Sequence, residues 1–145
     1  MTAEHARQSC STASEAETLA LGADWAQQFK GGELVFLKGA LGAGKTTLVR
    51  GLLRGLGFEG RVKSPSYGLL ESYELDPLTI HHLDLYRLGH AEELFDLGLE
   101  ELLAPNTVVL VEWPERAERA LPDPHWMIEI ESNGNDRVFE VSRYN

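Results

Sequence analysis

The sequence predicts a single α/β domain of three layers, in which helices cover both faces of a mixed β-sheet. An apolar run at 34–37 leads through a glycine-rich loop into a segment with apolar residues at helical spacing. A second apolar run, at 107–111, is typical of a parallel strand that is buried on both faces. Near the C-terminus, 126–130 and 137–141 alternate between apolar and polar residues around a polar turn. We therefore expect parallel strands in the core of the sheet and antiparallel strands at its C-terminal side.

The composition fits one domain that spans 1–145. With 43% hydrophobic residues, a chain of 145 residues buries about two thirds of the surface that it exposes when unfolded. The polar segment 1–13 is expected to be frayed, and the thiol of Cys10 has no predicted catalytic role. Neither a signal-peptide pattern nor an apolar stretch of membrane-spanning length occurs, so we expect a cytoplasmic protein with no membrane partner.

The net charge argues against direct binding to nucleic acid. Lys and Arg total 13 while Asp and Glu total 23, which gives a net charge of −10. The phosphate backbone of RNA or DNA repels such a chain. Any link to RNA should therefore run through a protein partner.

The segment 39–47, GALGAGKTT, carries the most specific chemistry in the chain. It matches the phosphate-binding P-loop pattern G-x-x-x-x-G-K-[ST] and lies between the strand at 34–37 and a predicted helix at 46–56, as that pattern requires. Its glycines permit positive φ, so that backbone amides form a concavity for an anion at the helix N-terminus. Lys45 would contact the β- and γ-phosphates, and the Thr46 hydroxyl would ligate Mg²⁺. The predicted nucleotide-binding residues of this P-loop NTPase-like fold are Gly39, Leu41, Gly42, Ala43, Gly44, Lys45, Thr46 and Thr47.

The segment 14–30 has the pattern of an amphipathic helix. Ser14 is a plausible N-cap and Glu17 occupies the capping-box position. Two glycines stop the helix and form a short link to the strand at 34, which brings the helix near the sheet edge where a nucleotide base could lie. Glu15 and Thr18 are therefore candidate nucleotide contacts, and plain packing of the helix on the sheet is the alternative for both.

Other segments have weaker patterns. Strands are expected at 69–73 and 80–84, and 91–103 predicts two short helices hinged near Gly98. Between the P-loop helix and these strands, Pro65 forces the residue before it towards extended geometry. The hydroxyl of Ser66 is a candidate sensor of the γ-phosphate, and a simple Ser-Pro turn is the alternative.

Two carboxylates follow predicted strands. Asp84 ends the strand at 80–84, and Glu112 directly follows the apolar run at 107–111. In α/β sheets the carboxyl ends of strands are where ligands bind, and a carboxylate there can polarise the attacking water or complete a Mg²⁺ shell. A strand-end cap for Asp84 and a helix N-cap for Glu112 are the alternatives. The catalytic candidates are Lys45, Asp84 and Glu112, and the Mg²⁺ candidates are Thr46, Asp84 and Glu112.

The adjacent histidines His81 and His82 do not predict a metal site. Neighbouring residues on a strand point to opposite faces of the sheet, so the two side chains cannot chelate one ion together. We therefore expect no zinc here.

Four segments taken together resemble a known family. They read GALGAGKTT at 39–47, SPSY at 64–67, HLDLYRL at 82–88 and VEWPE at 111–115. In this order they are similar to the TsaE (YjeE) family, small bacterial ATPases of the pathway that makes threonylcarbamoyladenosine in tRNA. The similarity covers nearly the whole chain, from about Ser14 to Tyr144.

The resemblance implies ATP and Mg²⁺ as cofactors and assigns roles to the matching positions. It implies that Lys45 binds phosphates, that Thr46 and Glu112 serve Mg²⁺ and that Asp84 supports that shell. Ser66 would belong to a switch loop, where the family usually has Thr, and the helix with Glu15 and Thr18 would close over the nucleotide. The family usually has Asp at the position of Ala40, which leaves any contact made through that carboxylate open.

The resemblance also implies partners. These are the TsaD and TsaB proteins, with ATP binding and hydrolysis resetting their complex, and tRNA would be reached only through them. Hydrolysis by the isolated protein should be slow because the sequence has no evident arginine finger apart from Arg87. The oligomeric state is left open.

Three other functions are alternatives to this one. A guanine-nucleotide switch would need an [NT]-K-x-D motif, which the sequence lacks. A small-molecule kinase would need an acceptor pocket and a lid, for which 145 residues leave little room. A non-catalytic module that assembles in response to ATP predicts the same P-loop, and only turnover measurements separate it from an ATPase.

Overall fold

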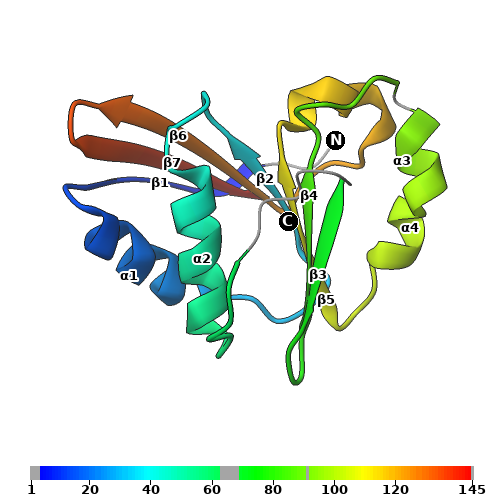
Figure 1. The fold of residues 1–145 in the computed structure, drawn as a ribbon, viewed down its shortest axis with the longest axis horizontal. Coiled ribbons are helices and arrows are strands. Elements are labelled where there is room, and N and C mark those ends of the chain that lie inside the picture. The colour runs from blue at the N-terminus through cyan, green and yellow to red at the C-terminus, as the bar shows by residue number, and fades with distance from the viewer. Residues whose placement is uncertain (1–3, 63–68, 91, 145) are drawn as a thin grey trace.

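In the part of the chain that the structure describes, seven strands form one mixed sheet in the order β1-β7-β6-β2-β5-β4-β3 (Figure 1). The computed structural model describes residues 4–62, 69–90 and 92–144. The strands are β1 (Glu4–Thr12), β2 (Leu34–Lys38), β3 (Leu70–Glu74), β4 (Thr79–Asp84), β5 (Thr107–Glu112), β6 (Trp126–Asn133) and β7 (Asp136–Tyr144). The four central strands, β6, β2, β5 and β4, run parallel to one another, whereas β3 pairs antiparallel with β4, β7 with β6 and β1 with β7. The predicted mixed sheet with a parallel core is thus confirmed.

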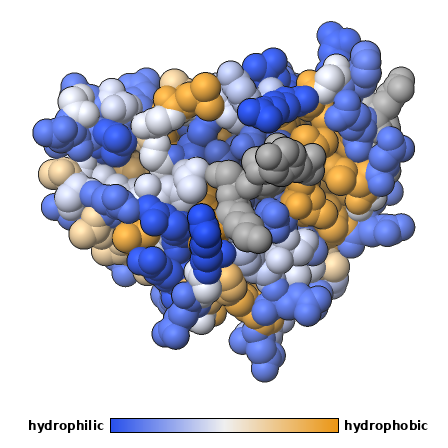
Figure 2. Space-filling model, viewed as in Figure 1, coloured by the Kyte–Doolittle hydropathy of each residue, from blue (hydrophilic) through white to orange (hydrophobic). Residues whose placement is uncertain are grey.

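Helices lie on both faces of this sheet. They are α1 (Glu15–Ala26), α2 (Lys45–Gly55), α3 (Glu92–Leu97), α4 (Leu99–Leu102) and the 3₁₀ helix η1 (Pro114–Ala120). Figure 1 shows α1 and α2 on one side and α3 and α4 on the other. None of the described helices is long and apolar enough to cross a membrane. The face seen in Figure 2 is mostly hydrophilic, as the net charge of −10 leads one to expect.

The apolar run of β2 is continuous because both faces of this strand are covered. Val35 and Leu37 face the first core, between the sheet and α1 and α2, whereas Leu34 and Phe36 face the second core, on the side of α3 and α4. β5 divides its four apolar residues in the same way. Burial of each such side chain contributes about 1.5 to 3 kcal/mol, so the strand that carries the P-loop is firmly fixed.

Glycines allow α1 and α2 to pack with their backbones in contact. A Cβ on Gly51 would lie 2.5 Å from the carbonyl oxygen of Leu19, and one on Gly22 would lie 2.8 Å from that of Leu48. No real Cβ tolerates such a distance to backbone. The close approach holds the N-terminal end of α1 next to that of α2.

The N-terminal segment differs from its prediction. Residues 4–12 form β1 and pair with β7, with Cys10 opposite Phe139, instead of fraying. Its polar composition concealed it because an edge strand is held by backbone hydrogen bonds and needs few apolar side chains. The thiol of Cys10 contacts the first core, and burial raises its pKa.

Most other elements agree with the patterns. Ser14 caps α1, since its Oγ accepts a hydrogen bond from the amide of Glu17 at 3.1 Å. Helix α1 ends at Ala26, short of the predicted limit of 30, because a tight turn follows it. Gly98, with φ of 68°, separates α3 from α4 as expected, and β6 and β7 form the predicted antiparallel pair.

Candidate functional site

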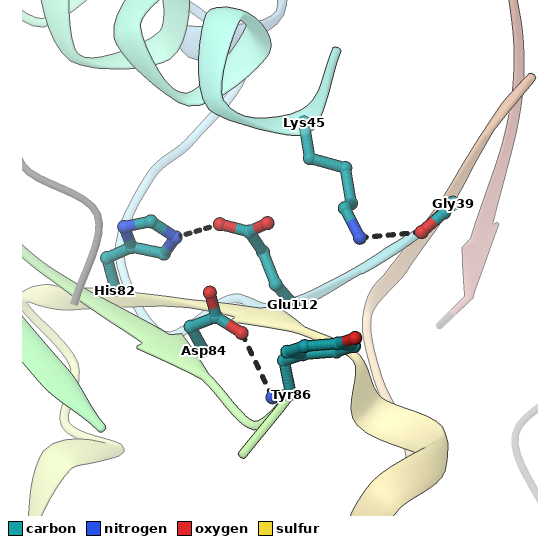
Figure 3. Close-up of polar contacts among 6 residues, drawn as sticks. All are labelled: Gly39, Lys45, His82, Asp84, Tyr86 and Glu112. Atoms are coloured by element: carbon teal, nitrogen blue, oxygen red, sulfur yellow. Dashed lines mark hydrogen bonds and ion pairs between the residues drawn. The ribbon is translucent and has the colours of Figure 1, made fainter. Parts of the chain in front are cut away.

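Three parallel strands end at one edge of the sheet. β2 runs directly into the P-loop, while β4 and β5 end at Asp84 and Glu112. The register places Glu112 between Leu37 on one side and Asp84 on the other. Ile80 and Leu110 face the first core, and residues an even number of positions further along the same strand share that face. Asp84 and Glu112 therefore both project to the side of the sheet on which α2 begins (Figure 3).

The P-loop presents backbone amides at the start of α2. Gly42 and Gly44 have φ of 78° and 110°, in the left-handed region that side chains disfavour. Gly44 is the N-cap of α2 and has no side chain to satisfy the first amides of the helix. These amides and the helix dipole are thus available to an anion. Thr46, the second residue of α2, is exposed.

Lys45 is buried and contacts Gly39 and Trp113. Its Nζ donates a hydrogen bond to the carbonyl oxygen of Gly39 at 2.6 Å and lies 3.9 Å from the centre of the Trp113 ring. Only 5% of the residue is exposed. Burial lowers the pKa of the amine, and the carboxylates of Glu112 and Asp84 oppose that effect. The amine therefore stands where added negative charge would stabilise its charged form.

The two carboxylates are held by different partners. Oε2 of Glu112 lies 2.5 Å from Nε2 of His82, and both residues are buried. Oδ1 of Asp84 accepts a hydrogen bond from the amide of Tyr86 at 3.0 Å. Burial raises the pKa of Asp84, and the Tyr86 amide works against that rise. Figure 3 shows both carboxylates on the same side as Lys45.

A pocket of about 340 Å³ joins these groups. Its walls are formed by Leu41, Gly42, Gly44, Lys45, Thr46, Thr47, Asp84, Glu112, Trp113 and Arg137. A hydroxyl and two carboxylates are hard oxygen donors of the kind that Mg²⁺ prefers. The described residues contain no cluster of three or more His, Cys, Asp or Glu side chains that could hold a metal. The set suits Mg²⁺ nonetheless, because that ion usually takes only one or two carboxylates and completes its shell with phosphate and water.

The remaining P-loop candidates lie on the other side of the loop. Gly39 and Ala43 line a separate hollow against β6, in which Glu129 and Glu131 are exposed. Leu41 borders both spaces and is 66% exposed. Not all the predicted phosphate contacts therefore face the same pocket.

Glu15 and Thr18 line a smaller adjoining pocket of about 130 Å³. Glu15 forms an ion pair with Arg50 at 2.5 Å, and the Thr18 hydroxyl is shared with Thr12 at 2.7 Å. Both side chains are thus engaged within the protein, so their contact with a nucleotide stays a prediction. Ser66 lies outside the described residues.

The sequence did not single out Arg137 and Trp113 as site residues. Arg137, near the start of β7, lines both pockets, and its Nε would lie 3.3 Å from a Cβ on Gly44. Trp113 has φ of 57°, unusual for a residue with a side chain, and such conformations gather at functional sites. Trp113 stands in the VEWPE segment and could have been noticed there. Arg87, the suggested arginine finger, is exposed and is not among the described residues that line either pocket.

Comparison with known proteins identifies the family of this chain. The model of the family described as "Threonylcarbamoyl adenosine biosynthesis protein TsaE" matches residues 12–139. The TsaE protein of Haemophilus influenzae is 42% identical over 108 residues, which cover 74% of this chain and 68% of that protein. The Bacillus subtilis TsaE protein is 38% identical over 125 residues, 86% of this chain and 78% of the relative.

A solved structure shares the fold. The crystal structure of Bacillus subtilis YdiB superposes with a TM-score of 0.82 at 29% sequence identity, covering all of this chain and 88% of the other. The match includes the strands and the P-loop that build the pocket. The chain therefore belongs to the TsaE family of tRNA threonylcarbamoyladenosine biosynthesis proteins.

Proposed function

We propose that this protein binds ATP with Mg²⁺ in the 340 Å³ pocket and hydrolyses it slowly. The observation that carries the proposal is the meeting of Lys45, Thr46, Asp84 and Glu112 in that one pocket, at the N-terminus of α2. A P-loop with its lysine, a hydroxyl and a strand-end carboxylate are the parts that hold a nucleoside triphosphate in P-loop enzymes.

Different residues of the pocket would bind the phosphates, hold Mg²⁺ and orient water. The amides that follow Gly44 and the Nζ of Lys45 would bind the phosphates, and Lys45 would leave Gly39 to do so. Thr46, Asp84 and Glu112 would hold Mg²⁺, which when bound neutralises charge on the phosphates. Glu112 stands at the pocket wall, where its carboxylate can orient water or accept a proton from it.

Arg137 is a further phosphate-binding candidate. Its guanidinium borders both pockets next to Gly44, and the hairpin supports it through a hydrogen bond from Nη1 to the Ser132 hydroxyl at 3.1 Å. A planar, always charged side chain at this place suits an anionic ligand.

We further propose that ATP binding and hydrolysis reset a complex with the TsaD and TsaB proteins. Two facts support an indirect link to tRNA. The family acts in tRNA threonylcarbamoyladenosine biosynthesis, and a net charge of −10 disfavours direct contact with RNA.

The test is phosphate release from ATP, measured for the protein alone and with purified TsaD and TsaB. We expect slow release alone and faster release with the pair, and neither with a Lys45→Ala variant. If ATP promoted assembly with the pair without any phosphate release, the protein would be a non-catalytic assembly module.

A further inference from the structure

Glu112 has a buried partner that the proposed function does not use. His82 lies within β4, is 0% exposed, and meets the carboxylate through Nε2 at 2.5 Å. A carboxylate can only accept, so Nε2 carries the hydrogen and donates it to Oε2 of Glu112. His82 lines none of the three spaces described above, so its effect on the site passes through Glu112.

The contact makes the two oxygens of Glu112 unequal. Oε2 is engaged by His82, while the other oxygen points to the side on which Lys45 lies (Figure 3). A carboxylate fixed at one oxygen cannot rotate freely, so its second oxygen keeps one direction. Outer partners of this kind commonly orient metal ligands.

We propose that His82 is a positioning residue, which holds Glu112 so that its free oxygen faces the divalent cation of the bound nucleotide. This inference rests on the proposed function of the pocket. It adds that His82 orients Glu112, one of the metal ligands. Asp84 needs no such side chain, because the backbone amide of Tyr86 already fixes it.

Packing alone does not account for a histidine at this position. The neighbouring inward residues Ile80 and Leu110 are apolar and fully buried, and a leucine at 82 would fit the same core without polar atoms. Nδ1 of His82 has no hydrogen-bond partner among the described residues. A buried polar pair with an unsatisfied atom generally destabilises a fold relative to apolar packing. The His82–Glu112 pair is thus unfavourable for the stability of the fold. Orientation of the Glu112 carboxylate is a function that explains why a histidine occupies this position.

The experiment measures binding of Mn²⁺, as a spectroscopic probe for Mg²⁺, to the ADP-loaded protein by electron paramagnetic resonance. His82→Gln retains an amide N–H that reaches the place of Nε2, whereas the amide of His82→Asn is too short to do so. His82→Met removes the donor and keeps the volume. His81→Gln is the matched control, since His81 is the adjacent residue and contacts Ser72 instead, with Nδ1 2.7 Å from its hydroxyl.

We expect Mn²⁺ affinity to fall about 10- to 100-fold in His82→Asn and His82→Met and to change little in His82→Gln and His81→Gln. The affinity for ADP in the absence of metal should be unchanged in all four variants. A variant that had lost its fold would also lose its affinity for ADP, so this measurement serves as the folding control. Parent-like Mn²⁺ affinity in His82→Asn would overturn the inference and leave the nucleotide site intact. If His82→Met fails to fold, the comparison of His82→Gln with His82→Asn still tests the inference. Should the parent protein itself bind Mn²⁺ no better with ADP than without it, both this inference and the proposed function would fail.

Discussion

The ammonium group of Lys45 lies over the ring of Trp113, 3.9 Å from its centre. The same amine donates a hydrogen bond to the carbonyl oxygen of Gly39. A desolvated cation–π contact is worth about 2 kcal/mol. Phosphate binding must therefore compete with two existing contacts, and Trp113 should sense the change.

The first prediction is that nucleotide binding alters the fluorescence of Trp113. Trp25 and Trp126 are buried in the first core, away from the pocket walls, so they should respond little. We expect ADP to change the emission of the parent and to leave that of Trp113→Phe unchanged. A signal of the same size in Trp113→Phe would show that it arises from Trp25 or Trp126, and it would contradict the prediction.

The second prediction concerns Lys45→Ala. A hydrogen bond to a charged group is worth about 1.5 to 3 kcal/mol, so ATP affinity should fall at least tenfold, or about 1.4 kcal/mol. The fold should survive because the amine faces the pocket. Calorimetry gives the affinity and circular dichroism checks the fold. Lys30→Ala is the control, because Lys30 is an exposed lysine in the turn after α1. Unchanged ATP affinity in Lys45→Ala would rule out the P-loop assignment.

The third prediction separates the two carboxylates. Glu112→Gln should bind ATP normally in the absence of metal, because the amide has the same shape and its oxygen can still accept from His82. Phosphate release should nevertheless fall at least 100-fold, the lower range of general-base effects. Release is measured with and without TsaD and TsaB. If Glu112→Gln turned over like the parent while Asp84→Asn did not, the catalytic role would belong to Asp84.

The fourth prediction tests Arg137. Arg137→Ala removes a guanidinium that borders both pockets, so nucleotide affinity should fall about tenfold. Arg143→Ala serves as the control, because Arg143 lies further along β7 and stacks on Trp126 at 4.5 Å. Equal affinities of the two variants would argue that Arg137 only packs against the P-loop.

The fifth prediction follows from the raised pKa of Asp84. Burial favours the protonated form in the folded protein, so this group supports stability fully below its ordinary pKa of 3.8 and loses that contribution as pH rises through the folded pKa. At neutral pH the ionised carboxylate therefore destabilises the protein without metal or nucleotide. Asp84→Asn should melt at a higher temperature than the parent at pH 7.5, with a gain that shrinks towards pH 4. Asp96→Asn, at an exposed position on α3, should show no such gain.

The sequence pattern predicted the features of the fold that depend on neighbouring residues in the chain. β2 and β5 were evident because burial on both faces requires continuous apolar runs, and the position of Glu112 at the end of β5 followed from the break in that run. The meeting of Asp84 with Glu112 was also predictable, since parallel strands end at one edge of a sheet.

The features of the site that the sequence did not reveal depend on how the strands pair in the sheet. Arg137 reaches the P-loop because β6 pairs with β2 and carries β7 beside it, and no pattern around 137 encodes that pairing. The opposite directions of His81 and His82 were foreseeable from the alternation along a strand. The partner of His82 was not, because its contact with Glu112 depends on the register between β4 and β5.

The pairing of β1 with β7 has a consequence for protein synthesis. Arg7 and Glu140, which form an ion pair across these strands, are 133 residues apart in the chain. At about 5 to 20 residues translated per second, β1 emerges roughly 7 to 27 s before its partner strand. For that time it has no neighbour in the sheet, and an apolar strand in this state would invite aggregation. The polar sequence of β1, which concealed it from pattern analysis, is thus suited to a segment that must wait in solvent on the ribosome.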